Sequence, residues 1–79
     1  MQRIRQRNLA NIDFADFQRT VEYYGFKLIR IRGSHHIYLN AVHGLQLNLQ
    51  PKSGQANLYQ VTQFLKLVEK HRITPRIPE

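Results

Sequence analysis

The stretch GFKLIRIRGSHHIY, residues 25–38, contains two runs of apolar and basic residues on either side of Gly33-Ser34. Gly25 follows a segment with helical spacing and predicts the end of that helix, because glycine adopts the left-handed conformation of helix C-termini at no steric cost. Residues 26–32 and 35–40 are rich in strand-forming side chains, and a Gly-Ser pair between such runs is typical of a tight turn. The stretch therefore predicts a helix end followed by an antiparallel hairpin.

Two segments have the apolar spacing of amphipathic helices. The first begins after Asp13 and has an acidic residue at Asp16, the arrangement of a capping box. Its apolar positions are Phe14, Phe17, Val21 and Tyr24. The second begins after Asn57, with Gln60 at the matching position, and is expected to reach about Lys70. Its apolar positions are Leu58, Val61, Leu65 and Val68.

A third strand is predicted between the hairpin and the second helix. Residues 45–49, Leu-Gln-Leu-Asn-Leu, alternate strictly, so the leucines should face the core and Gln46 and Asn48 should face outward. The element order is then helix, three strands, helix. We expect an α+β domain with a three-stranded antiparallel sheet that carries both helices on one face and leaves the other face open to solvent.

The sequence of the first strand, residues 26–32, does not show which of its faces is buried. If the strand alternates regularly, Lys27, Ile29 and Ile31 share one face. The other face then carries Phe26, Leu28, Arg30 and Arg32. Apolar and basic residues are mixed on both faces, so the pattern does not say which face is buried.

Composition limits the class of function. A chain of 79 residues forms one domain with a small core and no deep substrate cavity, so a substrate must bind at the surface. Twelve Lys and Arg against five Asp and Glu give a formal charge of +7, which attracts phosphate backbones, although such charge also serves solubility. The chain has no cysteine, which excludes a disulfide framework, and no apolar run of signal or membrane length, so we expect a soluble cytoplasmic protein without a membrane partner.

His35 is the first candidate for chemistry. Imidazole titrates near neutral pH, so it can remove the proton from a ribose 2′-hydroxyl whose oxygen then attacks the adjacent phosphate without a metal ion. Arg30, Arg32 and Lys52 are candidates to bind the RNA backbone and to stabilise charge on the phosphoryl oxygens. The alternative is that His35 is a turn residue whose ring only hydrogen-bonds the backbone.

Ser34 and His36 are further candidate RNA contacts. Ser34 can hydrogen-bond a phosphate, although Gly-Ser is also an ordinary turn pair. Successive strand residues point to opposite faces, so His35 and His36 cannot both reach one phosphate or one metal ion from a regular strand. His43 and His71 lack an acidic partner at a suggestive spacing, and we therefore predict no metal and no cofactor.

Residues 25–38, with the helix before them and the strand and helix after them, resemble the HicA toxins of bacterial and archaeal toxin–antitoxin systems. The resemblance spans residues 11–71, and its core is the order glycine, aromatic residue, apolar-basic strand and Gly-Ser-His. Residues 47–51 and the Tyr59-Gln60 pair also look like one branch of that family. The resemblance implies a double-stranded-RNA-binding-like fold and an mRNA endonuclease that a HicB-like antitoxin neutralises. It further implies that His35, directly after Gly-Ser, is catalytic.

One departure from the family pattern leaves other functions open. Many relatives carry a Pro-x-His element after the third strand, whereas Pro51 is followed here by Lys52-Ser53, so Lys52 is expected to supply charge only. A non-catalytic RNA-binding module and an antitoxin-binding protein without activity remain alternatives to the ribonuclease. In each case we expect a single domain over residues 1–79, with a basic arm at 1–10, a HicA-like core at 11–71 and a fraying tail at 72–79.

Overall fold

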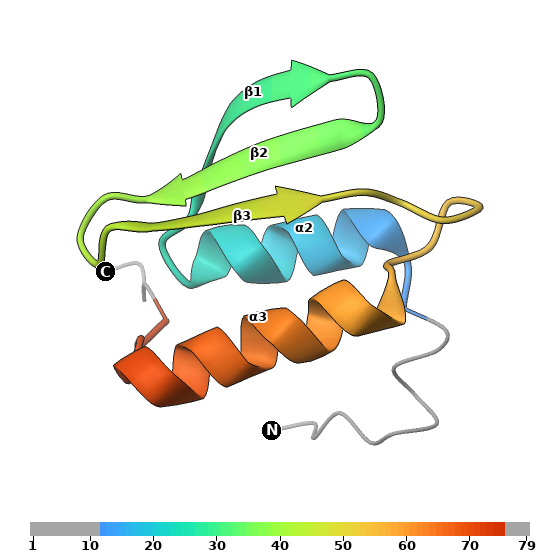
Figure 1. The fold of residues 1–79 in the computed structure, drawn as a ribbon. Coiled ribbons are helices and arrows are strands. Elements are labelled where there is room, and N and C mark those ends of the chain that lie inside the picture. Colours follow the sequence, from blue (N-terminus) through green and yellow to red (C-terminus); the bar gives the residue numbers. More distant parts are fainter. Residues whose placement is uncertain (1–11, 76–79) are drawn as a thin grey trace.

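The computed structural model describes residues 12–75 and confirms the predicted order of helix, three strands and helix (Figure 1). The elements are α2 (Phe14–Tyr23), β1 (Lys27–Arg32), β2 (His35–Asn40), β3 (Leu45–Leu49) and α3 (Leu58–His71). Gly25 follows α2 with a φ of 91°, the positive value that its position at a helix end requires. The predicted basic arm at residues 1–10 lies outside the described residues.

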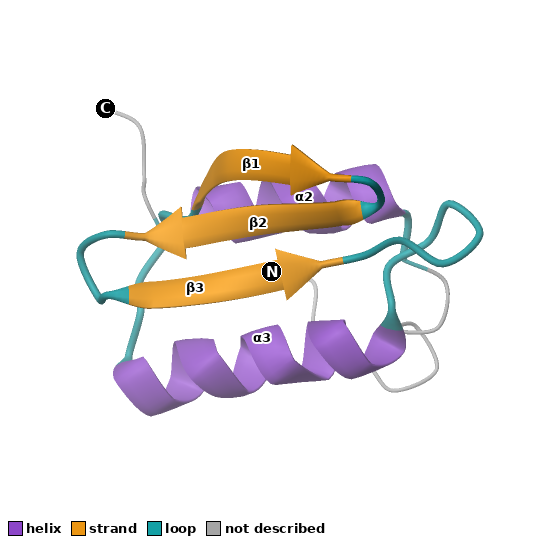
Figure 2. Ribbon diagram, turned by 45° about the horizontal axis from the view of Figure 1, so that its top comes forward, coloured by secondary structure: helices purple, strands orange, loops and turns teal. Residues whose placement is uncertain are grey.

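The three strands form one antiparallel sheet in the order β1-β2-β3. Both helices lie on the same side of this sheet, and the opposite face is open, as predicted (Figures 1 and 2). Gly33, with a φ of 60°, and Ser34 form the tight turn between β1 and β2. This turn fixes where β2 begins and therefore on which face each of its side chains lies.

The register of the sheet separates the two faces of β2. Tyr38 pairs with Leu47 and His36 pairs with Leu49, and these paired residues share the face that the helices cover. His35, Ile37 and Leu39 alternate with them and lie on the open face. Ile37 is 9% exposed and yet is not part of the core cluster, as expected for a residue covered by its neighbours on the open face.

A β-bulge between Leu28 and Arg30 makes the predicted regular alternation of β1 wrong. Leu28 pairs with Tyr38 and Ile31 pairs with His36, so both follow the helix face. Arg30 pairs with Ile37, and Arg32 pairs with His35 on the open face. The extra residue at the bulge changes the phase of the strand, and both arginines thereby remain in water instead of facing the helices.

The core lies between the sheet and the two helices. Phe64 of α3 is central to it, with edge-to-face ring contacts to Phe17, Tyr24 and Phe26 at centroid distances of 5.8, 5.6 and 6.0 Å. The largest fully buried side chains are Tyr38, Phe64, Leu49, Val21, Val61 and Asn40. Tyr38 thus packs in the core, on the face of β2 that the helices cover.

Neither helix begins with the complete capping box that the sequence predicted. Asp13 is the N-cap of α2, but its side chain makes no cap hydrogen bond, and Asp16 pairs with Arg19 instead. Asn57 does cap α3, because its Oδ1 accepts a hydrogen bond from the Tyr59 N–H at 2.9 Å. Gln60 does not complete this second box, since its side chain is hydrogen-bonded to β3.

The buried stripe of α3 differs from the predicted one. Val61 and Phe64 are buried, whereas Leu58 and Leu65 are 45% and 38% exposed. At the other end, Arg72 adopts the left-handed conformation and the Ile73 N–H donates to the Val68 carbonyl at 3.0 Å. Ile73 is 5% exposed, so the packed domain continues past residue 71 and the predicted fraying does not begin at residue 72.

None of the helices within residues 12–75 has the length and apolar character needed to cross a membrane.

Candidate functional site

The turn at Gly33-Ser34 places His35 at the first position of β2, on the open face of the sheet. Its side chain is exposed, and Arg32 lies directly across the hairpin from it. A ring in this position can meet a ligand laid on the sheet, which a ring directed at the helices could not do.

Asn48 holds the ring of His35. The Nδ1 atom of His35 lies 3.1 Å from Oδ1 of Asn48, which faces outward from the neighbouring strand β3. An amide oxygen only accepts hydrogen bonds, so Nδ1 carries the proton in this contact and the neutral ring has its free lone pair on Nε2. The arrangement therefore directs a potential base toward solvent.

Asn48 was not among the residues that the sequence singled out for chemistry. Its outward direction was predicted from the alternation of residues 45–49, and that is the only signal the sequence carries. Its contact with His35 depends on the register between β2 and β3, in which Asn48 pairs with Ile37, two residues along from His35.

Arg30 and Arg32 lie on the same open face as His35. Both are exposed, and their strand partners are Ile37 and His35. Among residues 12–75, the one ion pair joins Asp16 to Arg19, so no described carboxylate neutralises either arginine. The two guanidinium groups can therefore bind an anion that lies across β1 and β2.

His36 lies on the other face of the sheet, as strand alternation required. Its ring packs edge-to-face against Phe14 with centroids 5.0 Å apart, and its Nδ1 donates to the Ser34 carbonyl at 3.0 Å. The structure thus separates His36 from the open face and gives it a packing role beside α2. Ser34 is exposed in the turn next to His35, where its backbone carbonyl serves as the acceptor for His36.

Lys52 lies in the loop after β3, at the same end of the sheet as the Gly33-Ser34 turn (Figure 1). The backbone of Lys52 pairs with that of Gln55 through hydrogen bonds of 2.8 and 3.0 Å, which close a tight turn at Ser53-Gly54. Its side chain is exposed. Lys52 therefore adds positive charge at the end of the sheet where His35 lies.

The titratable group that the fold perturbs most clearly is outside this site. Burial raises the pKa of the Tyr38 phenol above its usual 10.0, and the nearby Glu22 carboxylate raises it further against the lowering effect of a hydrogen bond from Gln18. This phenol lies on the helix face, between α2 and β2, and serves packing rather than the open face. Within residues 12–75 no three His, Cys, Asp or Glu side chains gather as a metal site would require.

The chain matches no protein-family model, no curated protein and no solved structure.

Proposed function

We propose that this protein is a toxin of the HicA kind, a metal-independent endoribonuclease that cleaves mRNA with His35. The observation that supports this most is the position of His35, which lies exposed on the open face, hydrogen-bonded through Nδ1 to Asn48 and directly across from Arg32. The sequence resemblance to that family supplies the reaction, and the open face supplies a surface on which an extended polyanion can lie.

In the proposed reaction, Nε2 of His35 removes the proton from a ribose 2′-hydroxyl. The 2′-oxygen attacks the adjacent phosphorus in line, and the bond to the 5′-oxygen breaks. The products are a 2′,3′-cyclic phosphate and a 5′-hydroxyl that takes its proton from solvent. Arg30 and Arg32 stabilise the negative charge that develops on the phosphoryl oxygens, while Asn48 keeps the imidazole oriented.

Regulation follows from the same resemblance. An mRNA endonuclease of this kind is toxic to its own cell unless a partner protein covers it, and a HicB-like antitoxin is the proposed partner. The basic open face favours an acidic partner for the same reason that it favours RNA.

The test of this function is RNA cleavage by the purified protein in the presence of a chelator. We expect cleavage with cyclic phosphate ends, and we expect His35→Ala to lose about 10²–10⁴-fold in rate while it keeps its fold and its RNA affinity. His43→Ala is the matched control, because His43 is an exposed turn residue away from the site. Full activity in His35→Ala would refute the assignment of the base.

A non-catalytic RNA-binding module is the second candidate. The lysine-containing Pro51-Lys52-Ser53 segment favours it, because this end of the sheet gains charge but no second imidazole from the loop. This candidate predicts salt-sensitive binding after which the RNA is recovered intact.

A further inference from the structure

The two edge strands of the sheet, β1 and β3, differ in what contacts their outer backbone groups. Gln60 of α3 covers the end of the outer edge of β3, because its Oε1 accepts from the Gln50 N–H at 2.9 Å and its Nε2 donates to the Asn48 carbonyl at 3.1 Å. β1 forms the other edge, and no described strand pairs with its outer side (Figure 2). All six residues of β1 are exposed, so its outward N–H and C=O groups can pair with an incoming strand.

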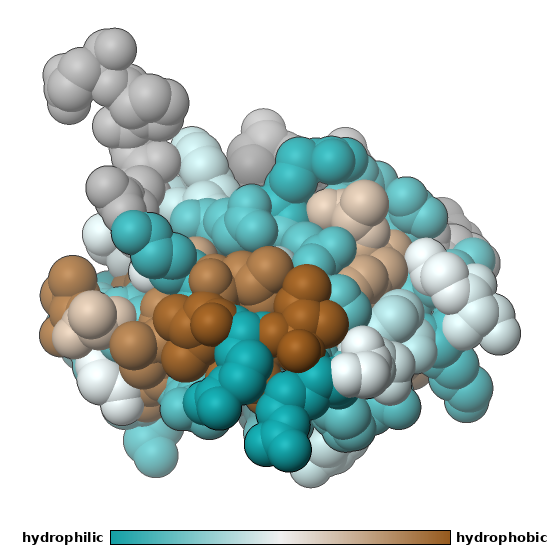
Figure 3. Space-filling model, turned by 90° about the horizontal axis from the view of Figure 1, so that it is seen from above, coloured by the Kyte–Doolittle hydropathy of each residue, from teal (hydrophilic) through white to brown (hydrophobic). Residues whose placement is uncertain are grey.

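Apolar side chains accompany this free edge. Leu28, Ile29 and Ile31 are 37%, 46% and 55% exposed, a large share for residues of this type. Seen from above, the molecule shows a continuous apolar area with hydrophilic side chains beside it (Figure 3). Single exposed apolar residues are ordinary, but a row of them on an unpaired strand is typical of an interaction surface.

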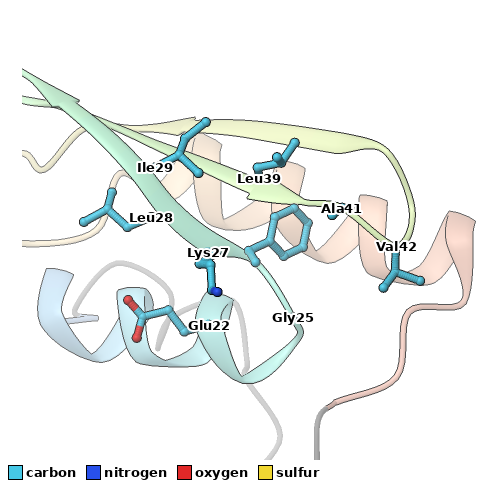
Figure 4. Close-up of a pocket in the computed structure, with 9 residues that line it drawn as sticks. Glu22, Gly25, Lys27, Leu28, Ile29, Leu39, Ala41 and Val42 are labelled. Carbon is cyan, nitrogen blue, oxygen red and sulfur yellow. The ribbon is translucent and has the colours of Figure 1, made fainter.

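An open groove of about 570 Å³ lies at the start of β1. Leu28 and Ile29 line it together with Leu39 of β2 and Val42 of the following turn (Figure 4). Glu22 of α2 is the one acidic residue that lines it, and its carboxylate accepts a hydrogen bond from the Tyr38 hydroxyl. The groove can receive apolar side chains of a strand added at β1.

Charge decides what kind of strand fits. β1 carries Lys27, Arg30 and Arg32 and no acidic residue. Pairing of β1 with the same strand of a second copy would align these cations with one another, and like charges across paired strands are destabilising. The same cations attract a strand that bears acidic side chains, so they act against self-association and in favour of an acidic partner.

We propose that β1 is a docking edge for an extended segment of an acidic partner protein, which adds to the sheet as a fourth strand with alternating acidic and apolar side chains. That this partner regulates chemistry on the open face around His35 rests on the proposed function. A strand added at β1 would lie roughly 10 Å from β2, two strand spacings away. Its acidic side chains would then neutralise Arg30 and Arg32 beside His35, and RNA would lose its binding surface.

The experiment uses the full chain and a blocked synthetic peptide of alternating glutamate and valine as the probe. Peptide binding is followed by fluorescence anisotropy, and hydrogen exchange reports the protection of residues 27–32. We expect saturable binding with slower exchange in β1. The corresponding lysine-valine peptide should bind at least about tenfold more weakly, because its charges repel those of β1.

Two N-methylated peptides separate strand addition from simple charge attraction. One carries methyl groups on every glutamate nitrogen and the other on every valine nitrogen, so each removes the backbone donors along one side of an extended peptide. Strand addition requires that at least one of them bind about tenfold more weakly than the parent peptide. Equal binding of all three, or no protection of β1, would overturn the proposal.

A matched pair of protein variants tests whether the peptide binds at β1. Ile29→Thr/Ile31→Thr keeps two β-branched residues in β1 while it removes apolar contact area, and it should weaken binding of the glutamate-valine peptide and leave RNA cleavage unchanged. Leu65→Gln alters a residue of α3 that is 38% exposed, much like Leu28, and should bind as the wild type does. The binding measurement contains no RNA. Cleavage without peptide binding would therefore defeat the docking proposal alone, and peptide binding without cleavage would defeat the proposed ribonuclease alone.

Discussion

Asn48 is the residue that converts an exposed imidazole into an oriented one. Its Oδ1 atom accepts from His35 Nδ1 at 3.1 Å. In the proposed reaction Asn48 would act only through the ring of His35, which makes it a positioning residue. Orientation of a catalytic group affects the chemical step more than the binding of a substrate that is held elsewhere by cations.

We predict that Asn48→Leu lowers kcat for RNA cleavage by about tenfold and leaves KM nearly unchanged, because the ring loses its fixed orientation while Arg30 and Arg32 still hold the RNA. Steady-state kinetics on a short RNA would measure both constants. Gln46→Leu is the control, since Gln46 is the other outward residue of the same strand. A rise in KM with kcat unchanged would instead make Asn48 an RNA contact.

Tyr38 joins two elements, the central strand β2 and the helix α2. Its side chain is fully buried, and its hydroxyl accepts from Gln18 Nε2 at 2.9 Å and donates to Glu22 Oε2 at 3.3 Å. Loss of these hydrogen bonds in Tyr38→Phe should cost about 1 kcal/mol of unfolding free energy near neutral pH. Tyr59→Phe, at a position that is 74% exposed, should cost nothing.

The Tyr38 phenol makes the free energy of unfolding decrease as the pH rises above 10. Its folded-state pKa is raised above 10.0, so below pH 10 it is protonated in both states and its contribution is complete. As the pH rises above that value, the unfolded chain releases the proton first and the wild type loses stability. Tyr38→Phe lacks this loss. The difference in unfolding free energy between the two proteins should therefore be smaller above pH 10 than below it, as measured by urea denaturation at a series of pH values. A difference that stays constant would contradict the raised pKa.

The order of the elements could be predicted from the sequence because each one carries its own local signal. The strict alternation of residues 45–49 and the glycines at 25 and 33 are examples. The bulge in β1 has no such signal, since Leu28, Ile29 and Arg30 suit a regular strand equally well. It is decided by tertiary packing, because regular alternation would bring Leu28 and the two arginines to the same face.

The candidate site was predictable only in part for the same reason. His35 could be singled out within its strand, but its face depended on the pairing of β2 with its neighbours. Gln60 shows the limit most clearly. Its spacing from Asn57 predicts a capping box, whereas its side chain instead bonds the backbone of Asn48 and Gln50, a contact between segments that local sequence does not encode.

At the scale of the whole molecule, cations within residues 12–75 lie on both sides of the sheet. Arg30 and Arg32 lie on the open face of the sheet, and Lys66 and Lys70 lie exposed on α3, which packs against the opposite face. Both pairs contribute equally to the net charge. Only the first pair is next to His35, so the two pairs distinguish a specific RNA surface from general attraction between a basic protein and a polyanion.

We predict that the salt dependence of RNA binding comes from the open face. Each phosphate contact on single-stranded RNA contributes about 0.7 to the slope of log affinity against log salt, so Arg30→Gln/Arg32→Gln should reduce that slope by about 1.4. Lys66→Gln/Lys70→Gln removes the same charge from α3 and should leave the slope nearly unchanged. Binding measured on His35→Ala, at several salt concentrations, avoids loss of the RNA to cleavage. If both double variants reduced the slope equally, RNA would be held by net charge rather than on the sheet, and His35 would have no bound substrate to act on.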